Sequence, residues 1–205
     1  MRVGVFGGTF DPVHYGHLIL AEQCREQAQL EQLLFVPAAV PPHKREQALT
    51  PFAQRVEMLA LALSGNPAFR IDELEKDRTG PSYTVDTLAQ LQAQRPGDEL
   101  CFIIGSDSLH DLPMWYQPSR ILELATLLVV ARADWPTFTE QELRAALKLA
   151  DDFPLRYQIV DAPLITLSSR DIRKRIAEAR SVRYMIPRAV EAYIDDKHLY
   201  SSRSA

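Results

Sequence analysis

The chain has 205 residues, of which 46% are hydrophobic and 24% are charged, and its formal net charge at pH 7 is −4. These values are typical of a globular protein with one main domain and exclude a disordered or fibrous chain. The acidic balance and the lack of a basic stripe argue against a nucleic-acid-binding protein.

The two cysteines, Cys24 and Cys101, lie far apart in sequence and form no C-x-x-C pair. We therefore expect buried, reduced thiols rather than a disulfide framework or a zinc site. The sequence begins with a strand-like run and no signal peptide, and its longest apolar stretch, near 127–131, is too short to span a bilayer. These features predict a cytoplasmic protein with no membrane partner.

Short apolar runs alternate with segments of helical periodicity along the chain. The runs predict strands, in chain order, at 3–6, 33–36, 69–74, 100–104, 127–131 and 156–160, with another strand-like segment at 163–166. The periodic segments predict helices at about 13–28, 51–64 and 82–94, from 139, from 168 to about 179, and from 187. Thr50, Thr139 and Ser168 are typical N-cap residues for three of these helices, and Glu142 and Asp171 complete two capping-box patterns.

Strand–helix alternation of this kind predicts an α/β fold: a Rossmann-like, doubly wound parallel sheet with helices on both faces. We expect a single domain over 1–205 with a small C-terminal helical part at about 168–205. Ligands of such sheets bind beyond the carboxyl ends of the strands, where the strand order reverses. The loops to inspect therefore follow Phe6, Val36, Leu74, Ile104 and Leu164.

The loop after the first predicted strand, residues 7–17 (GGTFDPVHYGH), is the most informative stretch. Its two leading glycines let the backbone approach a ligand closely, and the free N–H groups of the following helix favour an anion. His14 and His17 are three positions apart, so we expect them to share one face of the first helical turn. Either histidine alone would more often be an ordinary surface residue, and a zinc site would lack a third nearby ligand. The combination favours phosphate binding.

This stretch closely resembles the G-[GS]-[TS]-F-D-P-x-H-x-G-H signature of the nucleotidyltransferase superfamily. That superfamily includes nicotinate-nucleotide adenylyltransferases, pantetheine-phosphate adenylyltransferases and cytidylyltransferases, and class I aminoacyl-tRNA synthetases share a related element. The resemblance implies that His14 and His17 steady the α-phosphoryl group of ATP. It also implies that the ATP site includes Gly7, Gly8, Thr9 and Phe10.

A second phosphate element is predicted at residues 167–173 (LSSRDIR), where Ser168 caps a helix and Arg173 lies one turn further on. An arginine there can fork onto phosphate oxygens, although an ordinary capped helix with surface arginines would show the same pattern. The segment is similar to the superfamily motif I-S-S-T-x-I-R, which implies that Arg173 holds the β and γ phosphates. Arg170 stands where threonine is usual, so a hydroxyl contact at that position is in doubt.

The Pro-rich segment 37–45 (PAAVPPHKR) resembles the P-x-x-x-P-P-H-K segment of the nicotinate-nucleotide adenylyltransferase family. In that family the lysine reaches the phosphates, which implies the same role for Lys44. Three further segments extend the resemblance over nearly the whole chain: 78–88 (RTGPSYTVDTL), 102–107 (FIIGSD) with Leu112 and Trp115, and the tail 183–200.

These segments favour the nicotinate-nucleotide enzymes over the shorter pantetheine-phosphate enzymes. The resemblance implies ATP and nicotinate mononucleotide as substrates, Mg²⁺ carried by the ATP phosphates, and no metal ligands from the protein. Thr84, at a helix start, and Tyr116 would meet the nicotinate carboxylate through backbone N–H groups, and Trp115 offers a flat face to the pyridine ring. Asp107 could accept the ribose hydroxyls of ATP after Gly105.

Three alternatives remain at this stage. One is the same chemistry on nicotinamide mononucleotide or phosphopantetheine. Another is a nucleotide-binding regulator without catalysis, against which the intact His14, His17 and Arg173 argue. The third, a tRNA-binding synthetase fragment, is disfavoured by the short length and acidic charge. The sequence leaves the oligomeric state open, and a homo-oligomer is compatible with it.

Overall fold

The structure is a computed structural model that describes residues 1–41, 49–131 and 135–201. Six strands form one sheet in the order β3-β2-β1-β4-β5-β6, and every neighbouring pair is parallel. Chain order reverses between β1 and β4, so the loops after these two strands flank the switch point, where ligands bind in such sheets. The strands are β1 (Arg2–Gly8), β2 (Gln32–Pro37), β3 (Phe69–Ile71), β4 (Glu99–Gly105), β5 (Thr126–Val130) and β6 (Tyr157–Val160).

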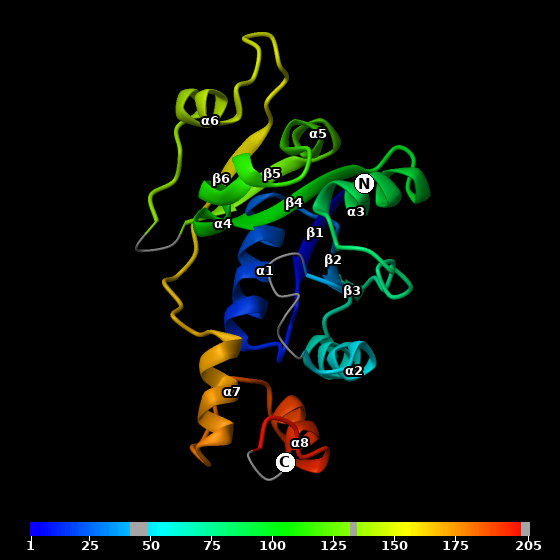
Figure 1. The fold of residues 1–205 in the computed structure, drawn as a ribbon, viewed down its shortest axis with the longest axis vertical. Coiled ribbons are helices and arrows are strands. Elements are labelled where there is room, and N and C mark those ends of the chain that lie inside the picture. The colour runs from blue at the N-terminus through cyan, green and yellow to red at the C-terminus, as the bar shows by residue number, and fades with distance from the viewer. Residues whose placement is uncertain (42–48, 132–134, 202–205) are drawn as a thin grey trace.

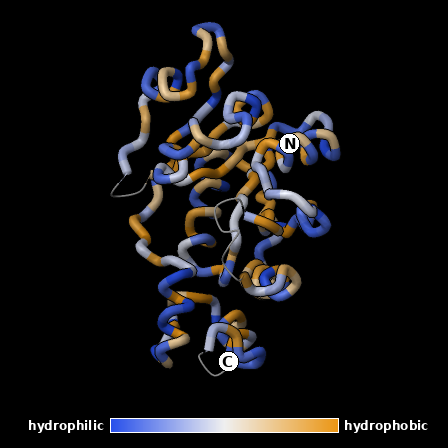
Figure 2. Tube along the Cα trace, in the orientation of Figure 1, coloured by the Kyte–Doolittle hydropathy of each residue, from blue (hydrophilic) through white to orange (hydrophobic). Residues whose placement is uncertain are grey.

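Helices cover both faces of this sheet (Figure 1), which confirms the predicted α/β, doubly wound architecture. Alternate strand residues enter two hydrophobic clusters: Leu33 and Phe35 pack into one, and Leu34 and Val36 into the other. Figure 2 shows the hydrophobic residues concentrated along the central strands. The helices are α1 (Tyr15–Gln27), α2 (Phe52–Leu63), α3 (Thr84–Gln94), α4 (Ser106–Asp111), the 3₁₀ helix η2 (Leu112–Met114), α5 (Pro118–Leu124), α6 (Glu140–Leu147), α7 (Ser169–Ala177) and α8 (Arg188–Asp196).

The C-terminal helices α7 and α8 lie together at one end of the molecule, next to the start of α1 (Figure 1). Helix α8 packs against α2. Ile172 of α7 and Val190 and Ile194 of α8 enter the hydrophobic cluster that contains Leu33 and Phe35. The C-terminal helical part therefore shares a hydrophobic core with one face of the sheet.

Several predicted boundaries were wrong by a few residues. Helix α1 begins at Tyr15 rather than near 13, because His14 has an extended backbone and serves as the N-cap. Pro51 is the N-cap of α2 and not its first helical residue. Strand β3 ends at Ile71, where the Asp72 carboxylate accepts a hydrogen bond from the Leu74 N–H and starts a turn. The capping box of α6, from Thr139 to Glu142, is confirmed.

Two larger differences lie near the ends of the later strands. The segment 163–166 is not a strand; its proline cannot donate to a ladder hydrogen bond. The helices α4, η2 and α5 were not predicted, because they are only three to seven residues long and too short to show a helical period. Within the described ranges, no helix combines the length and apolarity needed to cross a lipid bilayer.

Candidate active site

At the start of the loop after β1, the ring of Phe10 packs closely against Gly8. A Cβ at Gly8 would lie 2.9 Å from Cζ of Phe10, so only glycine leaves room for that ring. Phe10 is 1% exposed, has a φ of 48°, and places its ring 5.1 Å from that of His17. The Phe10 ring therefore packs between Gly8 and His17. The predicted loop began at Gly7, but Gly7 and Gly8 are the last residues of β1, and the turn lies at Asp11 and Pro12.

The two candidate histidines lie together at the start of α1. Their rings stack with centroids 3.6 Å apart and an interplanar angle of 21°. The backbone N–H of His14 donates to Nδ1 of His17 at 3.2 Å. A neutral His17 that accepts at Nδ1 carries its proton on Nε2, which can then donate to a phosphate oxygen. The sequence predicted this pair, although His14 caps the helix and does not lie within it.

Gly16 makes room for the His14 ring. A Cβ at position 16 would lie 2.9 Å from Nδ1 and 3.0 Å from Cε1 of that imidazole. Tyr15 fixes the helix start from the other side, since its N–H donates to the carbonyl of Met185 at 3.0 Å. The His14 ring, 5% exposed, is thus confined between its neighbours.

Helix α7 binds directly to the same loop. Ser168 caps the helix by accepting from the Asp171 N–H at 3.1 Å, and its hydroxyl donates to the Asp171 carboxylate at 2.7 Å. Ser169 donates to the carbonyl of Pro12 at 2.9 Å, and Nη1 of Arg173 donates to the carbonyl of Asp11 at 2.6 Å. The second phosphate element therefore lies against the segment that leads from Gly8 to His14.

Arg173 lines a cavity of about 420 Å³ together with two further cationic side chains, Arg170 and Lys174. The same cavity is lined by Asp11, Thr50, Ala177 and Tyr200. His14 and His17 are not among its lining residues. The histidines and Arg173 therefore do not line one pocket; the chain segment 11–14 connects them. A cavity with three cations suits a polyphosphate.

A second group of candidates follows β4. Gly105 is the N-cap of α4 and Asp107 lies in its first turn. Trp115, half-buried after η2, packs edge-to-face against Phe102 with centroids 6.2 Å apart. Its indole Nε1 is buried and makes no hydrogen bond within the described part of the chain.

Tyr83 links the start of α3, where Thr84 lies, to Tyr116. Thr84 is the first residue of α3, whose N-cap is Tyr83. The ring of Tyr83 lies 4.7 Å from that of Tyr116, which is 49% exposed. Tyr116 therefore contacts the N-cap residue of the helix that begins at Thr84, the other residue that the resemblance assigns to the nicotinate carboxylate.

Buried charged residues form the supports that sequence reasoning missed. Arg55, 1% exposed, donates from Nη1 to the Thr9 carbonyl at 2.7 Å and from Nε to the Thr50 carbonyl at 3.0 Å. Desolvation lowers the pKa of Arg55, and the nearby Asp11 charge opposes that effect. Glu75, 5% exposed, accepts from the Thr87 hydroxyl at 2.5 Å and from the Ala39 N–H at 3.3 Å.

Glu75 therefore connects Ala39 with Thr87 in the first turn of α3. Lys44, with His43 and Arg45, lies outside the described residues. Asp11 could have been identified from its place in the quoted signature, and Tyr200 from its place in the tail 183–200, which also resembles the family.

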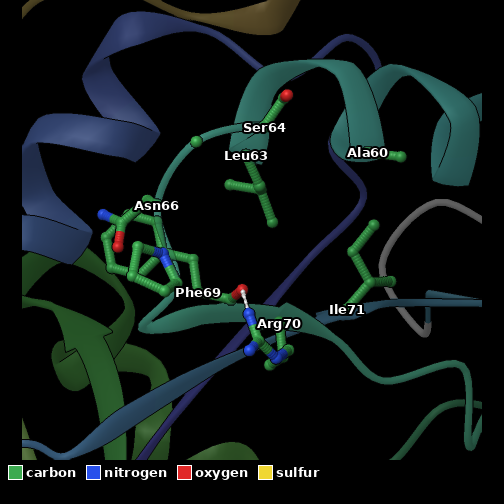
Figure 3. A pocket seen from close by; sticks show the side chains of 9 residues that line it. Ala60, Leu63, Ser64, Asn66, Phe69, Arg70 and Ile71 are labelled. Carbon is green, nitrogen blue, oxygen red and sulfur yellow. Dashed lines mark hydrogen bonds between the residues drawn. The ribbon is translucent and has the colours of Figure 1, made fainter.

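A cavity of about 520 Å³, larger than the one that Arg173 lines, lies elsewhere (Figure 3). It is lined by the end of α2, the turn 64–67 and β3, and includes none of the candidate residues. Size therefore does not mark the site in this molecule. Among the described residues, no group of three His, Cys, Asp or Glu side chains is placed to hold a metal ion.

The chain is similar over its length to known proteins. A family model described as cytidylyltransferase-like matches residues 5–175. A probable nicotinate-nucleotide adenylyltransferase of Thermomicrobium roseum is 48% identical over 204 residues, covering 100% of this chain and 94% of the relative. One of Thermus thermophilus is 45% identical over 200 residues, covering 98% and 100%.

Among solved structures, the Plasmodium falciparum nicotinic acid mononucleotide adenylyltransferase complexed with NaAD has the same fold, with a TM-score of 0.79 at 18% identity. The match covers 97% of each chain. The identity to the bacterial relatives extends over the full chain, and the fold carries the paired histidines at its switch point. The chain belongs to the nicotinate-nucleotide adenylyltransferase family of cytidylyltransferase-like proteins.

Proposed function

We propose that this chain transfers the AMP part of ATP to the phosphate of nicotinate mononucleotide, giving nicotinate adenine dinucleotide and pyrophosphate. The observation that carries the proposal is the stacked pair His14–His17 on the same loop that Arg173 contacts. The names of the bacterial relatives support the acceptor. This reaction is a step of NAD biosynthesis.

The acceptor phosphate oxygen attacks the α-phosphorus of ATP. The bond from that phosphorus to the bridging oxygen breaks, and its electron pair leaves with pyrophosphate. A phosphate monoester is largely dianionic at pH 7, so the attack requires no strong general base. Catalysis then consists of positioning the two phosphates in line and stabilising the charge that develops.

Residues of the loop and of α7 would bind different phosphates of ATP. His17, with its proton on Nε2, would donate to an α-phosphoryl oxygen, and His14 would hold it in place through the stack and the backbone bond. Arg173 has five N–H donors, so its guanidinium can bond the Asp11 carbonyl and still present donors to the β and γ phosphates. Lys44 and Ser168 would complete the phosphate contacts. Mg²⁺, held through the phosphate oxygens of ATP, would neutralise part of the triphosphate charge.

The acceptor would bind on the β4 side of the switch point. The start of α3 at Thr84 presents helix N–H groups, which favour a carboxylate. The neighbouring Tyr116 supports this placement, and the half-buried Trp115 offers its ring face to the pyridine. Gly105 and Asp107, at the start of α4, would meet the ATP ribose.

The direct test is to incubate the purified chain with Mg²⁺, ATP and nicotinate mononucleotide and to measure pyrophosphate together with the dinucleotide mass. One pyrophosphate per dinucleotide is expected, with none released when the acceptor is omitted. Release of phosphate, or of pyrophosphate without acceptor, would reject AMP transfer. Binding of ATP with no turnover would instead indicate a nucleotide-binding regulator.

A further inference from the structure

The C-terminal tail returns to the loop after β1 through one hydrogen bond. The hydroxyl of Tyr200 donates to Oδ1 of Asp11 at 2.6 Å, across 189 positions of the sequence. Asp11 is 2% exposed, so this contact is made out of water. Burial and the Asp11 charge both raise the pKa of Tyr200, which keeps the phenol protonated and able to donate.

Asp11 joins three other parts of the site. Its Oδ2 accepts from the Thr50 N–H at 3.3 Å, and its carbonyl accepts from Nη1 of Arg173 at 2.6 Å. The carbonyl of Thr50 accepts a hydrogen bond from the buried Arg55. The Asp11 carboxylate therefore connects Tyr200 of the tail with Thr50, and the Asp11 carbonyl holds the guanidinium of Arg173.

Four carbonyl groups at the end of β1 and in the loop accept hydrogen bonds from other segments. Gly8 accepts from the Ala38 N–H, Thr9 from Arg55, Asp11 from Arg173 and Pro12 from Ser169. Carbonyl oxygens repel phosphate oxygens, so fixing them away from the site prepares the loop for an anion. A change in the position of Asp11 would disturb this arrangement where Arg173 is attached.

Tyr200 is itself held in an unusual backbone conformation. Its φ is 63°, in the left-handed region that residues other than glycine rarely adopt. Such a conformation persists only where surrounding contacts enforce it, and such residues cluster at functional sites. Tyr200 also lines the cavity that contains Arg170, Arg173 and Lys174.

We propose that Tyr200 is a positioning residue for the triphosphate of ATP: by holding the Asp11 carboxylate it fixes Arg173 and Thr50. This inference rests on the proposed function, because it assigns the cavity to the substrate polyphosphate. It predicts an effect on ATP and not on the acceptor, whose candidate residues Thr84, Trp115 and Tyr116 lie on other elements.

The test is Tyr200→Phe, which keeps the ring and removes only the hydroxyl. Losing a hydrogen bond to a buried carboxylate should raise the KM for ATP by about tenfold, while the KM for nicotinate mononucleotide stays within about twofold. Tyr184→Phe is the matched control, since Tyr184 is 86% exposed, and it should change neither constant. Asp11→Asn should raise the KM for ATP as well, and adding Tyr200→Phe to it should have little further effect.

Unchanged KM for ATP in Tyr200→Phe would overturn the inference, as would a parallel rise for both substrates, which would indicate general loosening. Calorimetric binding of a non-hydrolysable ATP analogue separates this inference from the proposed function. If the wild-type chain binds the analogue but forms no dinucleotide, the proposed function fails. In that case, binding weakened about tenfold in Tyr200→Phe supports the inference, and unchanged binding overturns it.

Discussion

The imidazole rings of His14 and His17 lie face to face at the start of α1, with their centroids 3.6 Å apart. His14 is nearly buried and bonds Nδ1 of His17 through its backbone N–H. A displacement of either ring therefore moves the other, and the pair acts as one unit. If that unit holds the α-phosphoryl group, substitutions that leave the fold intact should still lower turnover.

Replacing His17 with alanine removes one charge-stabilising contact of the transition state. We expect kcat for pyrophosphate release to fall on the order of 10²-fold at saturating substrates. The far-UV circular dichroism spectrum should not change. His198→Asn, at an exposed position with a φ of 51° that asparagine tolerates, should retain wild-type turnover. Near-normal turnover in folded His17→Ala would remove His17 from the mechanism.

Gly16→Ala tests the same unit without touching either histidine. The new Cβ would lie 2.9 Å from the His14 ring, which is stacked on one side and cannot simply rotate away. We expect kcat to fall at least about tenfold, the loss associated with misplacing a reacting group by a fraction of an ångström. At Gly80 an added Cβ meets no atom within 4 Å, so Gly80→Ala controls for the stability effect of the substitution. Equal kcat in Gly16→Ala and wild type would contradict the packing argument.

Arg55→Met tests the buried support of the loop. The substitution keeps an apolar stem but leaves the Thr9 and Thr50 carbonyls and the Asp11 carboxylate without their cationic partner. The free energy of unfolding in urea should fall by about 3 kcal/mol. Arg188→Met, which breaks the surface pair with Glu191, should change it by no more than about 0.5 kcal/mol. A loss at Arg55 as small as that at Arg188 would show that the buried guanidinium is dispensable.

The two cysteines should be inert in the folded protein. Cys24 and Cys101 are both 0% exposed, and burial raises the pKa of Cys24 to about 12 and raises that of Cys101 as well. Because the thiolate is the reactive form, neither thiol should react with a chromogenic disulfide reagent at pH 8. Unfolding in guanidinium should release two reactive thiols per chain. Rapid reaction of the native protein would contradict this prediction.

Those parts of the fold that the sequence predicted are the parts with strong local signals. Leu100–Ile104 and the run near 127–131 are continuous apolar segments, as expected for central parallel strands, and both became strands. The spacing of His14 and His17 located the site loop, whereas the predicted turn at Gly7 and Gly8 was wrong, because both residues continue β1. The helices α4, η2 and α5 carry no comparable signal, since each spans two turns or fewer.

The missing parts of the site depend on contacts between distant segments. The Tyr200–Asp11 bond joins opposite ends of the chain, and no periodicity or spacing predicts such a partner. Arg55 lies on α2, and only the tertiary packing shows that this charged residue is buried. The role of His14 as an N-cap was missed because histidine is not a preferred capping residue. The assignment of Lys44 stays a prediction, because it lies outside the described residues.

The most direct measurement of the central claim compares two acceptors that differ only at one group of the pyridine. The rate of dinucleotide formation should be determined with saturating ATP and Mg²⁺ and equal concentrations of nicotinate mononucleotide or its amide, nicotinamide mononucleotide. With a carboxylate recognised at the start of α3, kcat/KM for the acid should exceed that for the amide by at least about tenfold. Equal values for the two acceptors, or a preference for the amide, would contradict the account.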